Sequence, residues 1–464
     1  MNHFEEYIAE WYDTIPEGGG TAASPWKIEW NDVPYKERDT RPLSRLKVLG
    51  AMKEVLFNGT PTQRAAVYIH IPFCRLSCTY CSFFKKKGDN KAQHEYVELL
   101  LKELESLSDK PYVKKSKISA VFFGGGTPGI LSAGDMADIL CAIKKTFLLA
   151  EDAEVTMESS LSDMTEEKMD VAIAGGVTRF SFGIQSFNSQ VRNTVGRPYS
   201  REEVLKQLSI YSKKKADIII DLIYGLPYET EETMRQDIRD AAACGIAGLD
   251  LYKLQLLPDS PLGKSFAAAG KCLIESEVQV FFQVAEEELN AIGAENISCS
   301  HWRMKQSERN LYNTIASGSD DLFAIGMACG GRIGGVSFMK PIPDAMYHSV
   351  VKMGMYCPMA AEKEGKYHAF FSALQSAGNR GIIDLSALEE MFGLPVAKLL
   401  MPLFQPWEVW GLLELIENQW RMTSPGRYWY RTMTRLILRA ADYMCFGLPE
   451  NTKKADWHGM INMK

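Results

Sequence analysis

The 464-residue sequence has no apolar run of membrane-spanning length, and its acidic first residues lack the features of a signal peptide. It has no excess of basic charge either. The net charge is -6, which argues against a nucleic-acid surface. Ten cysteines in a chain of this length are too sparse for a secreted disulfide framework. These absences predict a globular protein of the reducing cytoplasm.

The most informative stretch is VYIHIPFCRLSCTYCSFF at 67–84, where a short strand-like run leads directly into three cysteines. Cys74, Cys78 and Cys81 have the spacing C-x3-C-x2-C. Three thiolates on one loop can hold three irons of a four-iron cluster, whereas a complete protein shell uses four ligands. The spacing therefore predicts a [4Fe–4S] cluster with one open iron. A small chelating molecule such as S-adenosylmethionine (SAM) could fill that position.

Two other interpretations of the cysteines are a zinc site and buried free thiols. A zinc site needs a fourth Cys or His. The nearest candidate is His70, but in an alternating strand it has an awkward reach to the loop. The spacing therefore favours the cluster.

Strand-like and helix-like segments alternate through the first two thirds of the chain. Expected strands cover 67–71, 120–124, 154–160, 179–185, 217–225 and 249–256, and the helices between them include 94–107 and 133–147. Such alternation predicts a parallel sheet with right-handed crossovers. The cysteines and the other polar candidates fall at the carboxyl ends of successive strands, where barrels of this kind place their active sites.

At these residues the chain resembles the radical SAM superfamily. Within it, YIHIPFC at 68–74 is similar to the branch that contains oxygen-independent coproporphyrinogen oxidase. The resemblance implies an α/β fold with a partial (βα)6 barrel, one [4Fe–4S] cluster and two molecules of SAM. Four parts are expected along the chain: an N-terminal arm (1–60) with a helix near 45–56, the barrel (61–300), a substrate-covering segment (301–380) and a winged-helix-like α+β module (381–464) with a short hairpin around 419–430.

The resemblance also implies which residues bind SAM. The first SAM molecule would contact four positions, namely Tyr68, Gly125, Glu158 and Gln255, the last through its backbone because it replaces a small residue. The second would contact Gly126, Thr127, Gln185, Arg197 and Asp221. Two alternatives stay open: Glu158 as a solvated loop acid, and Asp221 as half of a core ion pair with Arg197.

Three further stretches resemble the anaerobic haem-degrading members of the branch, the anaerobilin synthases: HWR at 301–303, ERNLYN at 308–313 and AIGMACGGRIGG at 324–335. Coproporphyrinogen oxidase carries another cysteine where this chain has Phe83, next to Ser82. The likeness implies a radical SAM methyltransferase that opens haem and releases iron. Its partners would be haem, a reduced flavodoxin-type donor and a tetrapyrrole acceptor protein. A porphyrinogen decarboxylase and a haem chaperone with a regulatory cluster remain the alternatives.

His301, beside Trp302 and Arg303, is the candidate catalytic residue, as a haem ligand or proton donor. Arg303, Arg309 and Arg332 could pair with haem propionates or could equally be surface arginines. The C-terminal module is notable for Trp and Met rather than for basic residues, so a lid or packing module is expected rather than a DNA-binding domain.

Overall fold

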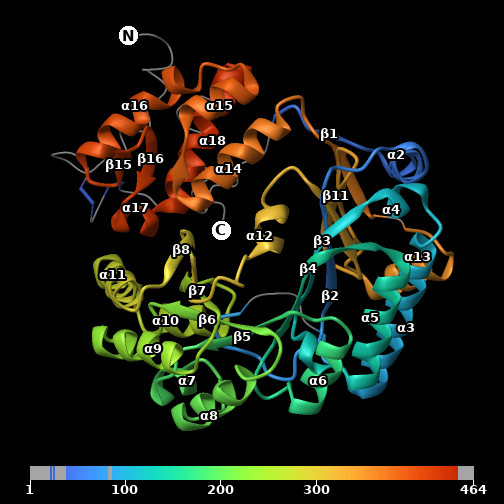
Figure 1. The fold of residues 1–464 in the computed structure, drawn as a ribbon, viewed down its shortest axis with the longest axis horizontal. Helices are drawn as coiled ribbons and strands as arrows, with labels where there is room; N and C mark the ends of the chain where they lie inside the picture. The colour runs from blue at the N-terminus through green and yellow to red at the C-terminus, as the bar shows by residue number, and fades with distance from the viewer. Residues whose placement is uncertain (1–20, 23–24, 27–37, 82–85, 357, 448–464) are drawn as a thin grey trace.

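A sheet of 13 strands forms the frame of the molecule. The computed structural model describes residues 21–22, 25–26, 38–81, 86–356 and 358–447. Seven adjacent strands are parallel, in the order β10 (Asp321–Ile325), β2 (Ala65–Ile71), β3 (Lys117–Gly125), β4 (Leu148–Ser159), β5 (Arg179–Gln185), β6 (Asp217–Tyr224) and β7 (Gly248–Lys253). They curve into an incomplete barrel (Figure 1). The expected α/β partial barrel is confirmed, with all six expected strands in parallel pairing.

The strands form where apolar residues run together, because both faces of this sheet are covered. In β6, only Asp217 and Asp221 are less than fully buried. Helices cover the outer face (Figure 1): α3 (Asn90–Leu107), α5 (Ala133–Thr146), α6 (Glu166–Ala174), α8 (Arg201–Tyr211) and α9 (Glu231–Ala243). Capping boxes at Ser200 and Thr230 begin α8 and α9, so the crossover helices have defined starting points.

The seventh parallel strand, β10, was not expected from the sequence. It pairs with β2 over all five of its residues, so that Asp321 lies beside Ala65 and Ile325 beside Ile69. The helix before it, α12 (Leu311–Ala316), has only six residues and lies in the opening of the barrel rather than outside it (Figure 1). No long amphipathic helix therefore precedes β10, and the alternating pattern is lost.

Antiparallel strands extend both edges of the parallel sheet. On the β7 side these are β9 (His301–Arg303) and β8 (Glu295–Ser298). On the β10 side they are β11 (Gly330–Ile333), β12 (Val336–Met339), β13 (Ala360–Lys363) and β1 (Arg41–Pro42). The segment 301–380, expected to cover the substrate, thus also supplies five strands of the main sheet.

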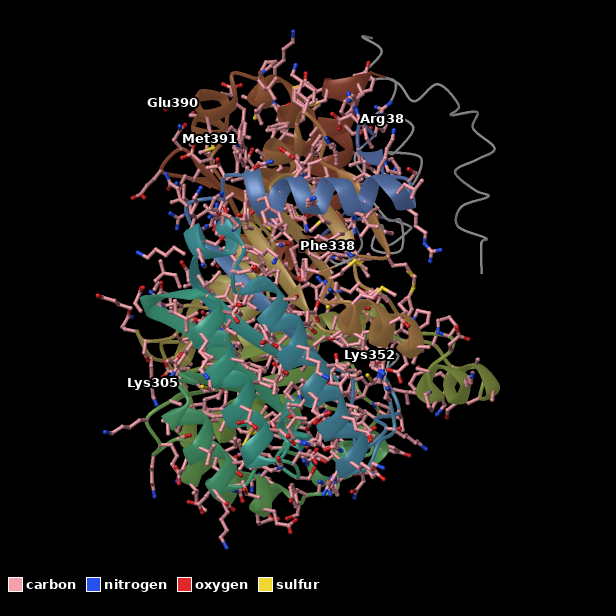
Figure 2. The ribbon with its side chains drawn as sticks, turned by 90° about the vertical axis from the view of Figure 1, so that its right-hand side faces the viewer. Arg38, Lys305, Phe338, Lys352, Glu390 and Met391 are labelled. Atoms are coloured by element: carbon pink, nitrogen blue, oxygen red, sulfur yellow. The ribbon has the colours of Figure 1, made fainter. Side chains whose placement is uncertain are left out.

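The C-terminal module joins a three-stranded sheet to five helices. The strands are β14 (Ile382–Ile383), β16 (Gln419–Met422) and β15 (Leu413–Ile416), and the helices are α14 (His368–Arg380), α15 (Leu385–Phe392), α16 (Val396–Val409), α17 (Ser424–Tyr428) and α18 (Tyr430–Phe446). In the structure the module begins with α14, before the expected boundary at 381, because α14 packs on α18 and β14. Figure 2 shows Glu390 and Met391 at the end of the module away from the barrel, and the Met391 side chain is 70% exposed.

The hairpin of this module differs from the expectation. The sequence suggested a hairpin around 419–430, but β16 pairs with the preceding β15, and 424–428 is the helix α17. Glu417 and Asn418 form the turn with φ values of 50° and 64°. Two consecutive residues with positive φ make the tight turn that matches the twist of a two-stranded hairpin. The turn was missed because Glu-Asn lacks the usual glycine.

The N-terminal arm packs on the C-terminal module. The Trp26 ring contacts Trp407, Trp410 and Trp429 edge to face, with centroid separations of 6.0, 6.2 and 6.0 Å. Helix α2 (Arg45–Asn58) follows, at the place expected from the sequence. The two ends of the described chain therefore stabilise each other.

The remaining helices are α4 (Pro111–Lys115), the 3-10 turn η2 (Pro128–Ile130), α7 (Ser189–Thr194), α10 (Pro261–Ala268), α11 (Glu275–Ala291) and α13 (Asp344–Lys352). Within the described ranges, no helix combines the length and apolarity needed to cross a membrane.

A buried ion pair joins α3 to the antiparallel extension of the sheet. Lys340 Nζ contacts Glu103 Oε1, and both residues are 1% exposed. The other carboxylate oxygen, Glu103 Oε2, accepts hydrogen bonds from Tyr347 (2.8 Å) and the Gly326 amide (2.9 Å). The charge of Glu103 is thus fully paired inside the protein.

Replacing Lys340 by Met should lower the free energy of unfolding by about 3–5 kcal/mol, because it leaves the Glu103 carboxylate buried without its cation. Urea denaturation measures the change. The matched control is Lys91→Met, which breaks only the exposed pair with Glu95 and should change stability by less than about 1 kcal/mol. Equal effects of the two substitutions would show that the buried pair does not tie α3 to the sheet.

Candidate active site

The three cysteines lie on the loop that follows β2. All three are partly exposed and none forms a disulfide. Two hydrogen bonds fix the loop between neighbouring segments: Thr79 Oγ1 donates to the Thr194 carbonyl (3.1 Å), and the Leu262 amide donates to the Thr79 carbonyl (2.8 Å). The loop is therefore held at the carboxyl end of the barrel, with its thiols at the surface of the opening.

The glycine turn after β3 is bonded directly to the cysteine loop. The Gly126 amide donates to the Ile71 carbonyl (2.7 Å), and the Thr127 amide donates to the Phe73 carbonyl (2.8 Å). A Cβ at Gly126 would lie 2.4 Å from the Phe73 oxygen, so only glycine fits. Thr127 Oγ1 is 3.4 Å from Cys74 Sγ. The turn and the cysteine loop thus form one rigid unit.

Tyr68 and His70 lie beside this unit, on the same face of β2. The Tyr68 hydroxyl is 3.2 Å from His70 Nδ1. Gly125 has φ +108°, and a Cβ there would lie 2.5 Å from the His70 ring. Burial lowers the pKa of His70 to about 4, so its ring is neutral at physiological pH. The proximity of His70 to the glycine turn was missed, although its i, i+2 relation to Tyr68 is a usable signal.

Two carboxylates share the barrel interior near the turn. A Cβ on Gly124 would lie 3.1 Å from both Glu158 Oε2 and Tyr68 Cε2, which places these two side chains together. Burial, with the nearby charge of Asp221, raises the pKa of Glu158 to about 8. Burial and Asp250 raise the pKa of Asp221 to about 7. A cationic ligand would restore both charges, as the sulfonium and amine of SAM would.

Gln185 and Arg197 meet above β5. Gln185 has φ 71° at a register shift between β5 and β6, an unusual backbone for a residue other than glycine. A Cβ at Gly183 would lie 2.7 Å from Gln185 Nε2 and 3.0 Å from Arg197 Nη2. Among the described residues, Gln185 Oε1 and Arg197 Nε are buried without a hydrogen-bond partner. Such unpaired atoms fit a site that a polar ligand completes.

Arg197 and Asp221 do not form the core ion pair that was considered as an alternative; each hydrogen-bonds to another residue. Arg197 Nη2 donates to the hydroxyl of Tyr80 on the cysteine loop (3.3 Å). Asp221 Oδ1 accepts from Ser181 Oγ (3.3 Å). Gln255 is exposed just beyond β7. The structure thus brings the predicted SAM residues to one end of the barrel, with Gln255 at its rim.

His301 does not join this group. It is fully buried on β9, with Nδ1 2.9 Å from Asp250 Oδ1 and Nε2 3.1 Å from Glu308 Oε1. Glu308 in turn pairs with Arg179 (3.0 Å), the first residue of β5. Both ring nitrogens therefore face buried carboxylates of the protein itself. This position favours a packing role over the expected haem contact.

The three arginines considered for propionates also have protein partners. Arg303 pairs with Glu295 (2.6 Å), Arg309 with Asp152 (2.8 Å), and Arg332 donates to the Asp320 carbonyl (2.7 Å). Ser82 and Phe83, which distinguish this sequence from coproporphyrinogen oxidase, lie in the segment 82–85, outside the described ranges.

The donor set fits a cluster better than a single metal ion. Across the described ranges, no three Cys, His, Asp or Glu side chains gather closely enough to hold one ion. In an iron–sulfur cluster each thiolate binds a different iron, so the thiolates need not converge on one point. The fold is an open partial barrel, its cysteine loop suits an iron–sulfur cluster, and its buried carboxylates favour a cationic ligand. These features indicate an enzyme that places a bound cation beside an iron–sulfur cluster.

Comparison with known proteins agrees with this class. Residues 68–241 match the Radical SAM superfamily. The chain is 31% identical to an anaerobilin synthase of Escherichia coli O157:H7 over 410 residues, covering 86% of this chain and 91% of the relative. It is 28% identical to a haem chaperone, HemW, of Lactococcus lactis, over 61% of this chain and 73% of the relative.

Among solved structures, coproporphyrinogen III oxidase from Escherichia coli shares the fold, with a TM-score of 0.70 at 21% identity over 87% of this chain and 96% of that one. The chain belongs to the radical SAM superfamily, whose members use a [4Fe–4S] cluster and SAM. Cys74, Cys78 and Cys81 are the residues available for the cluster.

Replacing Gly126 by Ala should reduce SAM cleavage on the order of a hundredfold, because the new methyl group displaces the cysteine loop. Iron and sulfide analysis, together with the rate of 5′-deoxyadenosine formation, measures the effect. Gly134→Ala is the control, since a Cβ there meets only Ser132 Oγ at 3.8 Å. Full activity of the Gly126 variant would contradict the rigid unit of turn and loop.

A second prediction concerns the pH dependence of stability. Burial lowers the pKa of His301, but Asp250 and Glu308 outweigh this and raise it to about 9, above the ordinary value of 6.5. The protonated ring thus contributes stability that is fully present below pH 6.5 and is lost as the pH rises through 9. We expect the free energy of unfolding to fall by up to about 3 kcal/mol across this interval. The His301→Gln variant should lack the decline in denaturant titrations; an unchanged decline would assign it to other groups.

Proposed function

We propose that this protein degrades haem anaerobically, opening the porphyrin ring with transfer of a SAM-derived methyl group and release of iron. The observation that carries the proposal is the 31% identity to an anaerobilin synthase along 91% of that relative, which extends well beyond the barrel. By contrast, the match to the haem chaperone of Lactococcus lactis is 28% identical and covers 61% of this chain.

The residues of the site have distinct proposed roles. Cys74, Cys78 and Cys81 hold three irons and leave the fourth for the amine and carboxylate of SAM. When bound, the reduced cluster supplies an electron to the sulfonium of SAM and so starts radical chemistry. Glu158 and the Gly125 backbone orient this first SAM, with Tyr68 beside them and Gln255 contributing its backbone.

A second SAM molecule would lie against the neighbouring strands. Thr127 and Gly126 would border it on one side, and the Asp221 carboxylate on β6 would be a partner for its sulfonium or amine. The unpaired buried atoms of Gln185 and Arg197 support this placement, because a polar ligand there would complete their hydrogen bonds. A reduced flavodoxin-type protein would supply electrons, and an acceptor protein would take up the linear tetrapyrrole.

Anaerobic incubation of the reconstituted protein with haem, SAM and dithionite tests the proposal. We expect loss of the haem absorption band and a methylated linear tetrapyrrole by mass spectrometry, with Cys81→Ala inactive. Intact bound haem would favour a chaperone instead. Decarboxylation of coproporphyrinogen, with haem left unchanged, would favour an oxidative decarboxylase.

Substitutions in the two SAM sites should have different effects on the two products, 5′-deoxyadenosine and the methylated tetrapyrrole. Glu158→Gln should stop the formation of 5′-deoxyadenosine, because it removes a charge that orients the first SAM. Arg197→Ala should allow 5′-deoxyadenosine to form but should cut the methylated product at least about tenfold. Loss of both products to the same extent in both variants would contradict the two-site arrangement.

A further inference from the structure

A cavity of about 430 Å³ lies where the C-terminal module meets the barrel. Its walls come from β7, the hairpin β8–β9, α12, the end of α14 and the first residue of α18. The Cys299 amide donates to the Asn379 carbonyl across this junction (2.8 Å). The cavity therefore exists because the module is fixed against the barrel. Its volume is within the range of small-molecule sites, roughly 300–1,000 Å³.

The lining of the cavity suits an anion. Arg309 and Arg380 line it, together with asparagines such as Asn313 and several residues with hydroxyl groups. Asp250 is the one acidic residue among the described residues that line it, and its carboxylate lies 2.9 Å from His301 Nδ1. Arg309 pairs with Asp152. The residues that line the cavity thus carry more hydrogen-bond donors and more positive charge than its acidic residue can neutralise.

Arg380 is the guanidinium available to a ligand. It is the last residue of α14 and is exposed. Within the described part of the chain its side chain makes no hydrogen bond or ion pair. A guanidinium can bind a carboxylate through two parallel hydrogen bonds, and such charge-assisted bonds are stronger than neutral ones.

The inner end of the cavity borders the SAM residues. Asp250 is the register partner of Asp221 on β6. The phenol of Tyr252, which lines the cavity, is close enough to Asp250, Asp221 and Tyr430 for their charges to add to the effect of burial in raising its pKa. A molecule with one arm in this cavity would therefore extend toward the place where radical chemistry starts.

Given the proposed function, on which this inference rests, we propose that the cavity binds a carboxylate side arm of the tetrapyrrole substrate and that Arg380 is its cationic partner. Asn313 and Tyr430 supply neutral donors beside it. Arg380 is an exposed lining residue, whereas Tyr252 is half-buried and follows Asp250, the neighbour of Asp221. A side arm held at Arg380 would therefore direct the macrocycle toward Asp221. Arg303, Arg309 and Arg332, the arginines considered from the sequence, each have a protein partner, whereas Arg380 lines a cavity and its side chain has none among the described residues.

Titration of the reconstituted protein with haem and with its dimethyl ester tests this proposal, followed by the Soret band. Arg380→Ala should weaken haem binding by about tenfold or more but should leave binding of the ester unchanged. Arg380→Lys should recover part of the loss. Lys398→Ala, an exposed position of the same module outside the cavity, is the control. SAM cleavage without haem should be equal in all four proteins.

Equal weakening of haem and ester by Arg380→Ala, or no weakening of either, would overturn the proposal. These results are separable from a failure of the proposed function. If the wild type opens haem and Arg380→Ala binds it normally, the cavity proposal fails and the function stands. If Arg380 gives carboxylate-dependent binding but the ring is never opened, the cavity proposal stands and the function fails.

Discussion

Two main-chain hydrogen bonds, from Gly126 to Ile71 and from Thr127 to Phe73, are the constraint on which the site depends. They join the end of β3 to the loop that carries the cysteines. The three cysteines are partly exposed, so the loop is held by hydrogen bonds, these two together with those of Thr79, rather than by burial of its thiols. The absence of a side chain at Gly126 is what permits the close approach.

The barrel interior carries two groups of charged side chains, with different consequences. Where β9 joins the sheet, His301 and Arg179 face Asp250 and Glu308, and the charges are paired within the protein. Near the glycine turn, burial and a neighbouring carboxylate raise the pKa of Glu158 to about 8 and that of Asp221 to about 7, and the nearby arginines offset this only in part. The paired group favours stability, and the second group favours binding of a positively charged ligand.

Much of this arrangement was predictable because its signals are local in the sequence. The cysteine spacing, the glycine turn and the strand ends at Glu158 and Gln185 each need only a few neighbouring residues, and parallel pairing then brings them together. The depth of His301 was not predictable, since it depends on β9 pairing antiparallel to β7. The cavity at Arg380 depends on the docking of a separate module. Neither has a local pattern.

The proposed chemistry depends on three cysteines that hold the cluster and leave one iron for SAM. Mössbauer spectroscopy of protein reconstituted with 57Fe, with and without SAM, tests this arrangement most directly. We expect about one iron in four to change its isomer shift and quadrupole splitting when SAM is added, while the other irons keep theirs. Four irons whose parameters stay the same in the presence of SAM would contradict it, because they would indicate a complete protein shell.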